Sequence, residues 1–308
     1  MKRLVTRSDF DGLVCAMILK ELKIIDDIKF VHPKDVQDGI IELSDNDITT
    51  NLPFDPRVYL SFDHHESEIT RVNNILTKGK LIIDPNAKSA ARVVYNFYGG
   101  ATNLPRISEE LMDAVDKGDS ASFSIDEILN PSKWVLLNYV MDPRTGLGRF
   151  HDFRISNYDL MMELIDYCLT HTIDEVMEIP DVKERTDLYF KQADLFKAQL
   201  KRITKIYDKV AVIDLRHEDI IYAGNRFMVY AMFPEVQISI HIAWGFKKQN
   251  TAVMIGKSIV NKSSKLNIGS LCLSYGGGGH ANAGTCQLDN DFVDIELPKI
   301  IQKINKES

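Results

Sequence analysis

The sequence predicts an α/β fold, because short apolar strands alternate with helical stretches and polar residues follow several of the strands. Arg3–Thr6 is β-rich, and Gly12–Lys23 carries apolar residues at helical spacing. Ser89–Tyr98 is a second predicted helix, with Ser89 as its N-cap. This alternation is typical of a parallel sheet whose ligands bind beyond the carboxyl ends of the strands. Further buried strands are expected at Lys29–Val31, Val58–Phe62 and Lys80–Ile83.

The chain after Ser108 is predicted to be mostly helical before strands return. Over Asp181–Lys205 the apolar residues recur at helical spacing, which indicates one long helix. Its apolar seam favours packing against the chain's own domains, although a homodimer remains compatible with it. Strands are expected at 210–214, 236–244 and 251–255. We therefore divide the chain into an N-terminal domain at 1–180, a linker helix at 181–208 and a smaller α/β domain at 209–308.

The composition argues against several classes of protein. The 308 residues include 37 Lys and Arg against 44 Asp and Glu, a net charge of −7, which disfavours binding long nucleic acid through charge alone. No stretch is apolar enough to cross a membrane. The four cysteines are scattered without CxxC spacing, so neither a disulfide framework nor a Cys-rich zinc site is expected, and we expect a cytoplasmic protein.

Two acidic motifs follow predicted strands. In Asp9-Phe10-Asp11-Gly12 two carboxylates can face one cation, and the glycine allows a tight turn. A helix cap with one spare acid explains this motif equally simply. Asp63-His64-His65 is more specific, because it combines a carboxylate with imidazoles, a ligand set suited to Mn²⁺, Fe²⁺ or Zn²⁺.

Further aspartates extend this set. Asp47 precedes the strand expected from Val58, and Asp116 and Asp119 follow a predicted helix. Each would be an ordinary turn acid on its own. Gathered together, four or five carboxylates would repel one another without cations, so a two-metal site is the simplest explanation.

A glycine run marks the C-terminal region. Four glycines precede His280, and their backbone N–H groups can cradle an anion. Gly256-Lys257-Ser258 imitates the end of a phosphate-binding P-loop, but Thr251 stands where that motif needs glycine, so we reject a nucleotide triphosphatase. Additional phosphate contacts are expected from Lys257, Ser258, Lys262 and Arg144.

Taken in order, these motifs resemble those of the DHH/DHHA1 phosphoesterase family. Asp9–Gly12 resembles its first motif, Asp47 the second, Asp63–His65 the third, Asp119 the fourth and Gly276–His280 the GGGGH signature. The resemblance covers nearly the whole chain. It implies a Rossmann-like parallel-sheet DHH domain, joined by a linker helix to a smaller α/β DHHA1 domain that binds substrate.

The resemblance also implies a pair of divalent cations, usually Mn²⁺. The implied ligands are Asp9, Asp11, Asp47, His64 and Asp119, with Asp47 bridging the two ions. His65 would face the substrate phosphate, and Asp63 would hold the motif in place. Many members carry a histidine four residues before the first aspartate, where this chain has Val5, so one metal position is expected to be weakened. At the other end of the substrate, binding would come from Gly277, Gly278, Gly279 and His280.

The expected activity is hydrolysis of very short oligonucleotides, or of linear or cyclic dinucleotides, to nucleoside monophosphates by metal-activated water. Two alternatives stay open. An exopolyphosphatase or pAp phosphatase would use the same metals, and a nucleotide sensor without turnover would explain Val5. Neither a membrane nor long duplex nucleic acid is expected as a partner.

Overall fold

The computed structural model describes residues 1–72 and 79–307, which form two compact units. The first comprises residues 1–123, 131–143 and 147–188, and the second comprises 124–130, 144–146 and 189–308. Each unit is described by itself. The predicted division at 1–180, 181–208 and 209–308 stays a proposal for independently folding parts.

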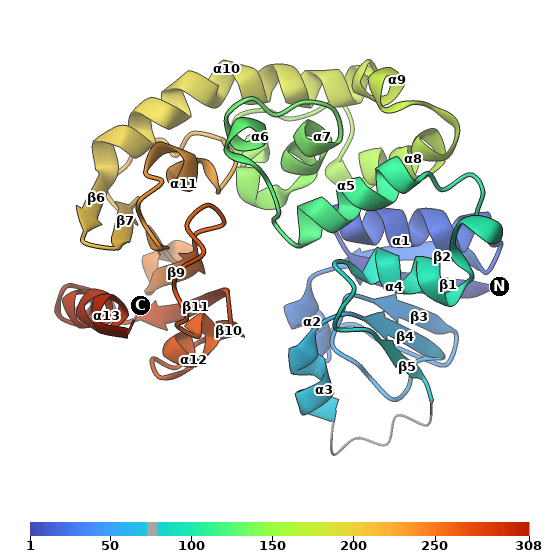
Figure 1. Ribbon diagram of the computed structural model, residues 1–308, viewed down its shortest axis with the longest axis horizontal. Coiled ribbons are helices and arrows are strands. Elements are labelled where there is room, and N and C mark those ends of the chain that lie inside the picture. Colours follow the sequence, from blue (N-terminus) through green and yellow to red (C-terminus); the bar gives the residue numbers. More distant parts are fainter. Residues whose placement is uncertain (73–78, 308) are drawn as a thin grey trace. The chain divides into compact units, whose positions relative to one another are not determined.

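The first unit is built on a five-stranded parallel sheet in the order β2-β1-β3-β4-β5 (Figure 1). The chain runs outward from β1 to β2 and then returns to the other side of β1 for β3. The order therefore reverses between β1 and β3, which is where open parallel sheets bind ligands. The strands are β1 Lys2–Arg7, β2 Ile25–Val31, β3 Asp47–Thr50, β4 Leu60–Asp63 and β5 Leu81–Ile83.

Helix α1 (Phe10–Glu21) lies at the centre of this unit. All of its residues from Phe10 to Leu19 are buried, as expected of a helix covered on every side. It packs against α4 (Ala90–Phe97), α5 (Glu109–Asp119) and α8 (Asn157–Thr170). Figure 1 shows α2 and α3 on the other side of the sheet, where an apolar cluster joins Val36 and Val72 to Val5. The remaining helices of the first unit are α2 Pro33–Gln37, α3 Glu66–Val72, α7 Lys133–Met141 and α9 Ile173–Met177, with 3-10 turns at Gly100–Thr102 and Leu147–Arg149.

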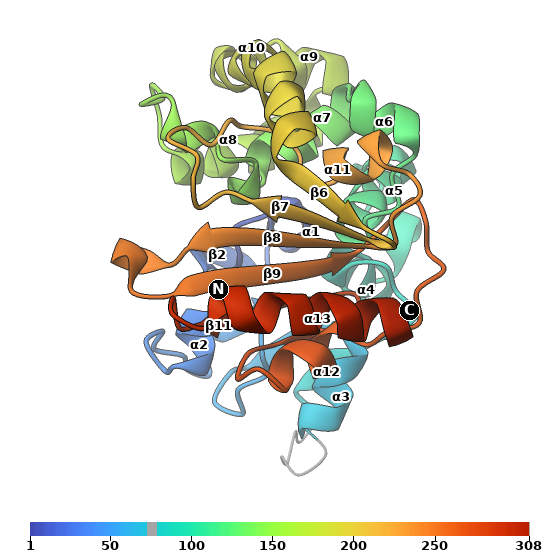
Figure 2. The ribbon, with the colours of Figure 1, turned by 90° about the vertical axis from the view of Figure 1, so that its left-hand side faces the viewer.

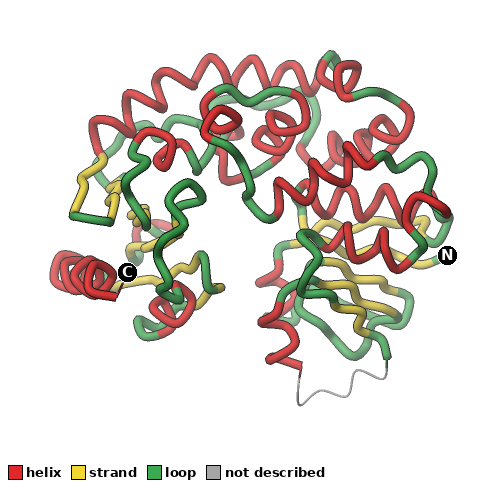
Figure 3. The backbone as a smooth tube through the Cα atoms, in the orientation of Figure 1, coloured by secondary structure: helices red, strands yellow, loops and turns green. Residues whose placement is uncertain are grey.

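The long helix α10 (Pro180–Ile203) leads from the first unit into the second (Figure 3). The second unit holds a mixed six-stranded sheet in the order β10-β11-β9-β8-β7-β6, in which only β7 and β8 are parallel. Figure 2 shows α12 and α13 on the same side of it, where their apolar residues join one core cluster. Its strands are β6 Thr204–Tyr207, β7 Val210–Asp214, β8 Ile238–Trp244, β9 Thr251–Lys257, β10 Gly278–His280 and β11 Ala283–Leu288. Its helices are α6 Ile125–Leu129, α11 Met228–Met232, α12 Ile268–Leu273 and α13 Val293–Glu307, with 3-10 turns at Pro143–Thr145 and Phe246–Lys248.

The predicted α/β class is confirmed, and most predicted elements lie within a few residues of those observed. Ser89 caps α4 by accepting a hydrogen bond from the Arg92 N–H. Four strands differ from the prediction: the short β3 lies in a predicted connection, β6 lies within the predicted linker helix, and β10 and β11 lie where no strand was expected. Within the described part of the chain, no helix has both the length and the apolar character needed to cross a membrane.

Gly12 is required where α1 begins beneath the end of β1. A Cβ atom at this position would lie 2.0 Å from the Arg7 carbonyl oxygen, so backbone would have to move. We expect Gly12→Ala to lower the free energy of unfolding by more than about 2 kcal/mol in thermal or denaturant unfolding. Gly148→Ala is the matched control, because nothing lies within 4 Å of its added Cβ. Equal stability of the two variants would contradict this account of Gly12.

Candidate metal site at the carboxyl edge of the parallel sheet

Three side chains from different elements converge where β1, β3 and β4 end. Asp11 stands in the first turn of α1, His64 follows β4, and Asp119 is the last residue of α5. Their ligand atoms all lie within 4.8 Å of one another. Metal ions hold protein ligands roughly 2.0–2.6 Å away, so this spacing fits one cation between them.

Asp11 is buried, and its carboxylate is held by the start of α4. Its Oδ1 accepts a hydrogen bond from the Ala91 N–H (2.8 Å), and its Oδ2 accepts one from Asn51 Nδ2 (2.7 Å). The first N–H groups of a helix have no partner within the helix and favour a negative charge. Burial, with the nearby Asp119 and Asp9, nevertheless raises the pKa of Asp11 to about 8. A cation at this point would offset that repulsion.

His64 presents one ring nitrogen to the cluster. Its Nδ1 lies 3.3 Å from the Ala87 carbonyl oxygen, which can only accept, so Nδ1 is the donor to this carbonyl and Nε2 is the nitrogen that faces the cluster. Nε2 lies 2.9 Å from Asp119 Oδ2, yet it is a buried atom without an aligned hydrogen bond. Burial alone would lower the pKa of His64, but the Asp119 carboxylate outweighs it and raises the pKa to about 9. The same contact lowers the pKa of Asp119 despite its burial.

Asp63 shapes the turn that carries both histidines. Its Oδ1 accepts hydrogen bonds from the His64 N–H (2.7 Å), the His65 N–H (3.1 Å) and His65 Nδ1 (2.7 Å). Asp63, His64 and His65 also form a second group of close ligand atoms. Because Asp63 Oδ1 already accepts three hydrogen bonds, its role in the metal-free fold is to position the histidines.

Asp9 caps α1 at the rim of the cluster. Its Oδ1 accepts a hydrogen bond from the Gly12 N–H (3.0 Å), and its Oδ2 lies 3.0 Å from Arg7 Nε. Arg7 is the last residue of β1, so its guanidinium lies at the same edge of the sheet.

The structure corrects the assignment of Asp47 as a bridging ligand. Asp47 is the first residue of β3 and pairs in register with Arg3, so it lies at the amino end of the strands, opposite the cluster. Its carboxylate is completely buried and accepts hydrogen bonds from Arg3 Nε (2.6 Å) and the Ser44 N–H (2.7 Å). The residue at the carboxyl end of β3 is Asn51. Asn51 was not among the predicted ligands, because the sequence pattern that predicts the site consists of carboxylates and imidazoles.

Asp116 and Asp119 have different surroundings although they share one helix. Asp116 accepts hydrogen bonds from Ser89 Oγ (2.6 Å) and Arg92 Nε (2.8 Å), which ties α5 to α4. Asp119, one turn later, reaches His64 instead. The structure therefore brings Asp119, and not Asp116, to the cluster.

The glycine run lies on the edge strand β10 of the second unit. A Cβ on Gly277 would lie 2.2 Å from the Thr285 carbonyl oxygen, and one on Gly279 would lie 2.3 Å from the Gly284 Cα, so both glycines are needed for close packing on β11. Gly278 has an ordinary backbone conformation and nothing within 4 Å of such a Cβ. His280 follows, and the strand is exposed.

The other predicted phosphate contacts differ in exposure. Lys257 is half-buried at the end of β9, and Lys262 and Arg144 are exposed. Ser258 is buried, and its Oγ accepts hydrogen bonds from the Val260 and Asn261 N–H groups. The hydroxyl oxygen of Ser258 is therefore engaged within its own turn, and a phosphate contact from its O–H stays a prediction.

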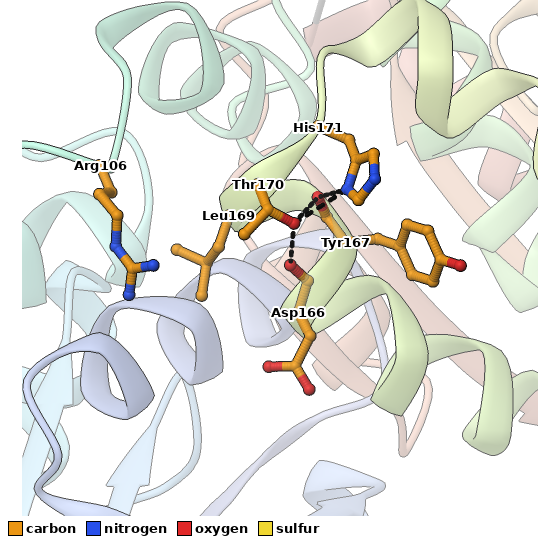
Figure 4. A pocket seen from close by; sticks show the side chains of 6 residues that line it. All are labelled: Arg106, Asp166, Tyr167, Leu169, Thr170 and His171. Carbon is orange, nitrogen blue, oxygen red and sulfur yellow. Dashed lines mark hydrogen bonds between the residues drawn. The ribbon is translucent and has the colours of Figure 1, made fainter.

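A surface hollow of about 260 Å³ lies at the carboxyl end of α8 (Figure 4). Its side chains are those of Arg106, Asp166, Tyr167, Leu169, Thr170 and His171. Its polar groups pair with near neighbours: Asp166 with Lys20, Arg106 with Glu21, and Thr170 with His171. None of the candidate metal ligands lines it, so we do not assign it to the chemistry.

Known proteins place this fold and site in one family. A solved structure of PggH, a pGpG-specific phosphodiesterase from Vibrio cholerae, is 52% identical to this chain over 100% of both chains, with a TM-score of 0.85. An exopolyphosphatase-related protein from Bacteroides fragilis matches 98% of this chain and 92% of its own (13% identity, TM-score 0.51). RecJ from Thermus thermophilus with Mn²⁺ matches 99% of this chain and 52% of its own (13% identity, TM-score 0.53). These last two share the fold alone. No protein-family model and no curated protein matches the chain.

The fold and its acidic edge are those of a metal-dependent phosphoester hydrolase. The chain belongs to the DHH/DHHA1 phosphoesterase family, which confirms the resemblance inferred from its motifs.

We expect Asp47 to stabilise the fold without binding the cation. Asp47→Asn should lower the free energy of unfolding by about 2 kcal/mol at pH 7, because hydrogen bonds to a charged group are lost. Arg3 and Ser44 outweigh burial and lower the pKa of Asp47. The stabilisation is therefore complete above the unfolded pKa of about 3.9 and is lost as pH falls through the lower folded pKa.

Denaturant unfolding at several pH values measures this effect, and the stabilities of wild type and variant should converge in acid. Asp119→Asn is the counterpart, expected to lose the cation in calorimetric titration while Asp47→Asn keeps it. Loss of cation binding in Asp47→Asn would return Asp47 to the ligand set.

Proposed function

We propose that this protein hydrolyses pGpG, a linear dinucleotide of two guanosines with a 5′-phosphate, to two molecules of GMP. The observation that carries the proposal is the 52% identity, over the full length of both chains, to a pGpG-specific phosphodiesterase. The convergence of Asp11, His64 and Asp119 supports it independently, because this ligand set suits a divalent cation. The four cysteines are free thiols, which supports a cytoplasmic location.

The proposed ligands of the cation are Asp11, His64 and Asp119. Mn²⁺ is favoured over Mg²⁺, because imidazole suits transition metals whereas Mg²⁺ prefers oxygen ligands and retained waters. A bound divalent cation supplies Lewis-acid stabilisation of phosphoryl charge and lowers the pKa of a water nucleophile. The Ala87 carbonyl and the α4 N-terminus orient His64 and Asp11 for that role.

His65 is the proposed contact to the scissile phosphate. Asp63 accepts a hydrogen bond from His65 Nδ1 and thereby fixes the orientation of the imidazole. Because Nδ1 is held by Asp63, Nε2 is the ring nitrogen of His65 that can face the substrate. A hydrogen bond between Nε2 and a non-bridging phosphate oxygen is the proposed contact, with Asp63 as its anchor.

The second unit is proposed to contribute substrate affinity rather than chemistry. Gly278 is the strongest indication, because its backbone is unstrained and its Cβ position is open. Packing within the unit therefore does not require glycine there, whereas close approach of a ligand to the backbone does. Gly277 and Gly279 shape the strand, and His280, Lys257, Lys262 and Arg144 are the proposed side-chain contacts.

A substrate panel tests the proposed activity. With Mn²⁺, we expect GMP release from pGpG to exceed that from a five-nucleotide RNA, a long single strand and cyclic di-GMP, and we expect excess EDTA to abolish it. Liquid chromatography of the products gives the rates. Faster release of phosphate from polyphosphate or pAp would favour a phosphatase, and binding of pGpG without turnover would indicate a sensor. Either outcome contradicts the proposal.

Gly278→Val tests the role of the glycine strand. A valine suits a β-strand and meets no atom here, so the free energy of unfolding should not fall. We expect KM for pGpG to rise about tenfold, equivalent to ~1.4 kcal/mol, with kcat and cation affinity retained. Gly148→Val, at another open glycine with ordinary backbone, should keep the wild-type KM. An unchanged KM in Gly278→Val would separate this strand from substrate binding.

A further inference from the structure

We infer that the metal site holds one divalent cation per chain, and that the Arg7 guanidinium supplies the fixed positive charge that a second cation would otherwise provide. The inference rests on the proposed function and departs from the two-metal site expected from the sequence. The inference depends on which metal-binding side chains lie at the carboxyl edge of the parallel sheet.

A two-cation site needs an anionic ligand shared between the ions. The aspartate expected to bridge, Asp47, lies at the opposite end of β3 and is paired with Arg3. Asn51 stands at the carboxyl end of that strand, 97% buried. An amide has a single neutral oxygen and is a poor bridge between two dications.

Asn51 is instead arranged to complete the surroundings of one ion. Its Nδ2 donates to Asp11 Oδ2 at 2.7 Å, which fixes the carboxylate, and its Oδ1 is a buried acceptor without a hydrogen-bond partner. A buried oxygen in this state costs free energy unless a cation or water satisfies it. Asn51 would thus add a neutral oxygen to the ligand set of Asp11, His64 and Asp119.

The place of a second ion is taken by Arg7, and Val5 does not reach the site. Arg7 Nε lies 3.0 Å from Asp9 Oδ2, and the Gly12 N–H binds Asp9 Oδ1, so both oxygens of this aspartate are engaged. A guanidinium stays charged at all physiological pH values and repels a dication placed on the same carboxylate. Val5, where a histidine ligand is common, is fully buried in the apolar cluster beneath the sheet.

Arg7 is also suited to contact the substrate. Its side chain is 31% exposed, and Asp9 holds it at the edge where the ligand cluster lies. The planar guanidinium can donate two parallel hydrogen bonds to phosphoryl oxygens. The positive charge for the transferring phosphate then comes from one cation and one arginine.

Counting bound cations tests this inference without relying on turnover. We expect calorimetric titration of the full chain with Mn²⁺ to give one ion, both alone and with a non-hydrolysable phosphorothioate analogue of pGpG. Electron paramagnetic resonance should show isolated Mn²⁺ rather than the coupled spectrum of a pair roughly 3.5–4 Å apart. Two ions per chain in either state would overturn the proposal.

Variants of Arg7 test its role. Arg7→Gln should still bind one Mn²⁺ but lose roughly 100-fold in kcat, because a donor to the transition state is removed. Arg7→Lys should recover part of this loss through its charge. Arg57→Gln is the matched control, since Arg57 pairs with Asp55 across the same two-residue spacing. Wild-type kcat in Arg7→Gln would overturn the proposal. By contrast, one ion without cleavage of pGpG would leave it standing and contradict the proposed function.

Discussion

The buried carboxylate of Asp11 is the feature on which the rest of the site depends. Water cannot solvate it, so its charge must be balanced by protein groups or by a cation. The first N–H groups of α4 and the Asn51 amide supply part of that balance. The negative charges of Asp119 and Asp9 act in the opposite direction. Burial together with these two charges raises the pKa of Asp11 to about 8. A divalent ion would remove this repulsion, so the same geometry that raises the pKa of Asp11 favours binding of a metal.

The topology of the sheet explains why these groups meet. Reversal of strand order between β1 and β3 opens a crevice beyond their carboxyl ends, where Asp11 and Asn51 follow their strands. The close approach of Gly12 to the Arg7 carbonyl lets α1 begin at once beneath β1. Asp119 arrives from a helix instead, and its position depends on the contact of Asp116 with Arg92, which fixes α5 against α4.

An acidic protein with a net charge of −7 can still bind a doubly or triply charged dinucleotide. In the proposed site the positive potential is local, because the cation and Arg7 lie at one edge of the parallel sheet. The backbone of β10 is proposed as an uncharged contact in the second unit. Local charge of this kind fits a short substrate better than a long single strand, which is bound along a basic groove.

The sequence by itself determined the fold class, the helices α1, α4 and α10, and the DHH motif, because these depend on local periodicity and on neighbouring residues. Ser89 capped α4 as predicted, and Asp63 binds both residues that follow it. Only the tertiary structure decided between Asp47 and Asn51. Asp47 is the first residue of β3 and Asn51 follows its last, and which of the two lies beside Asp11 is set by parallel register with β1. Register depends on pairing between segments that are distant in sequence. The sequence alone therefore does not distinguish a carboxylate at the amino end of a strand from one at the carboxyl end, where it could bind the cation.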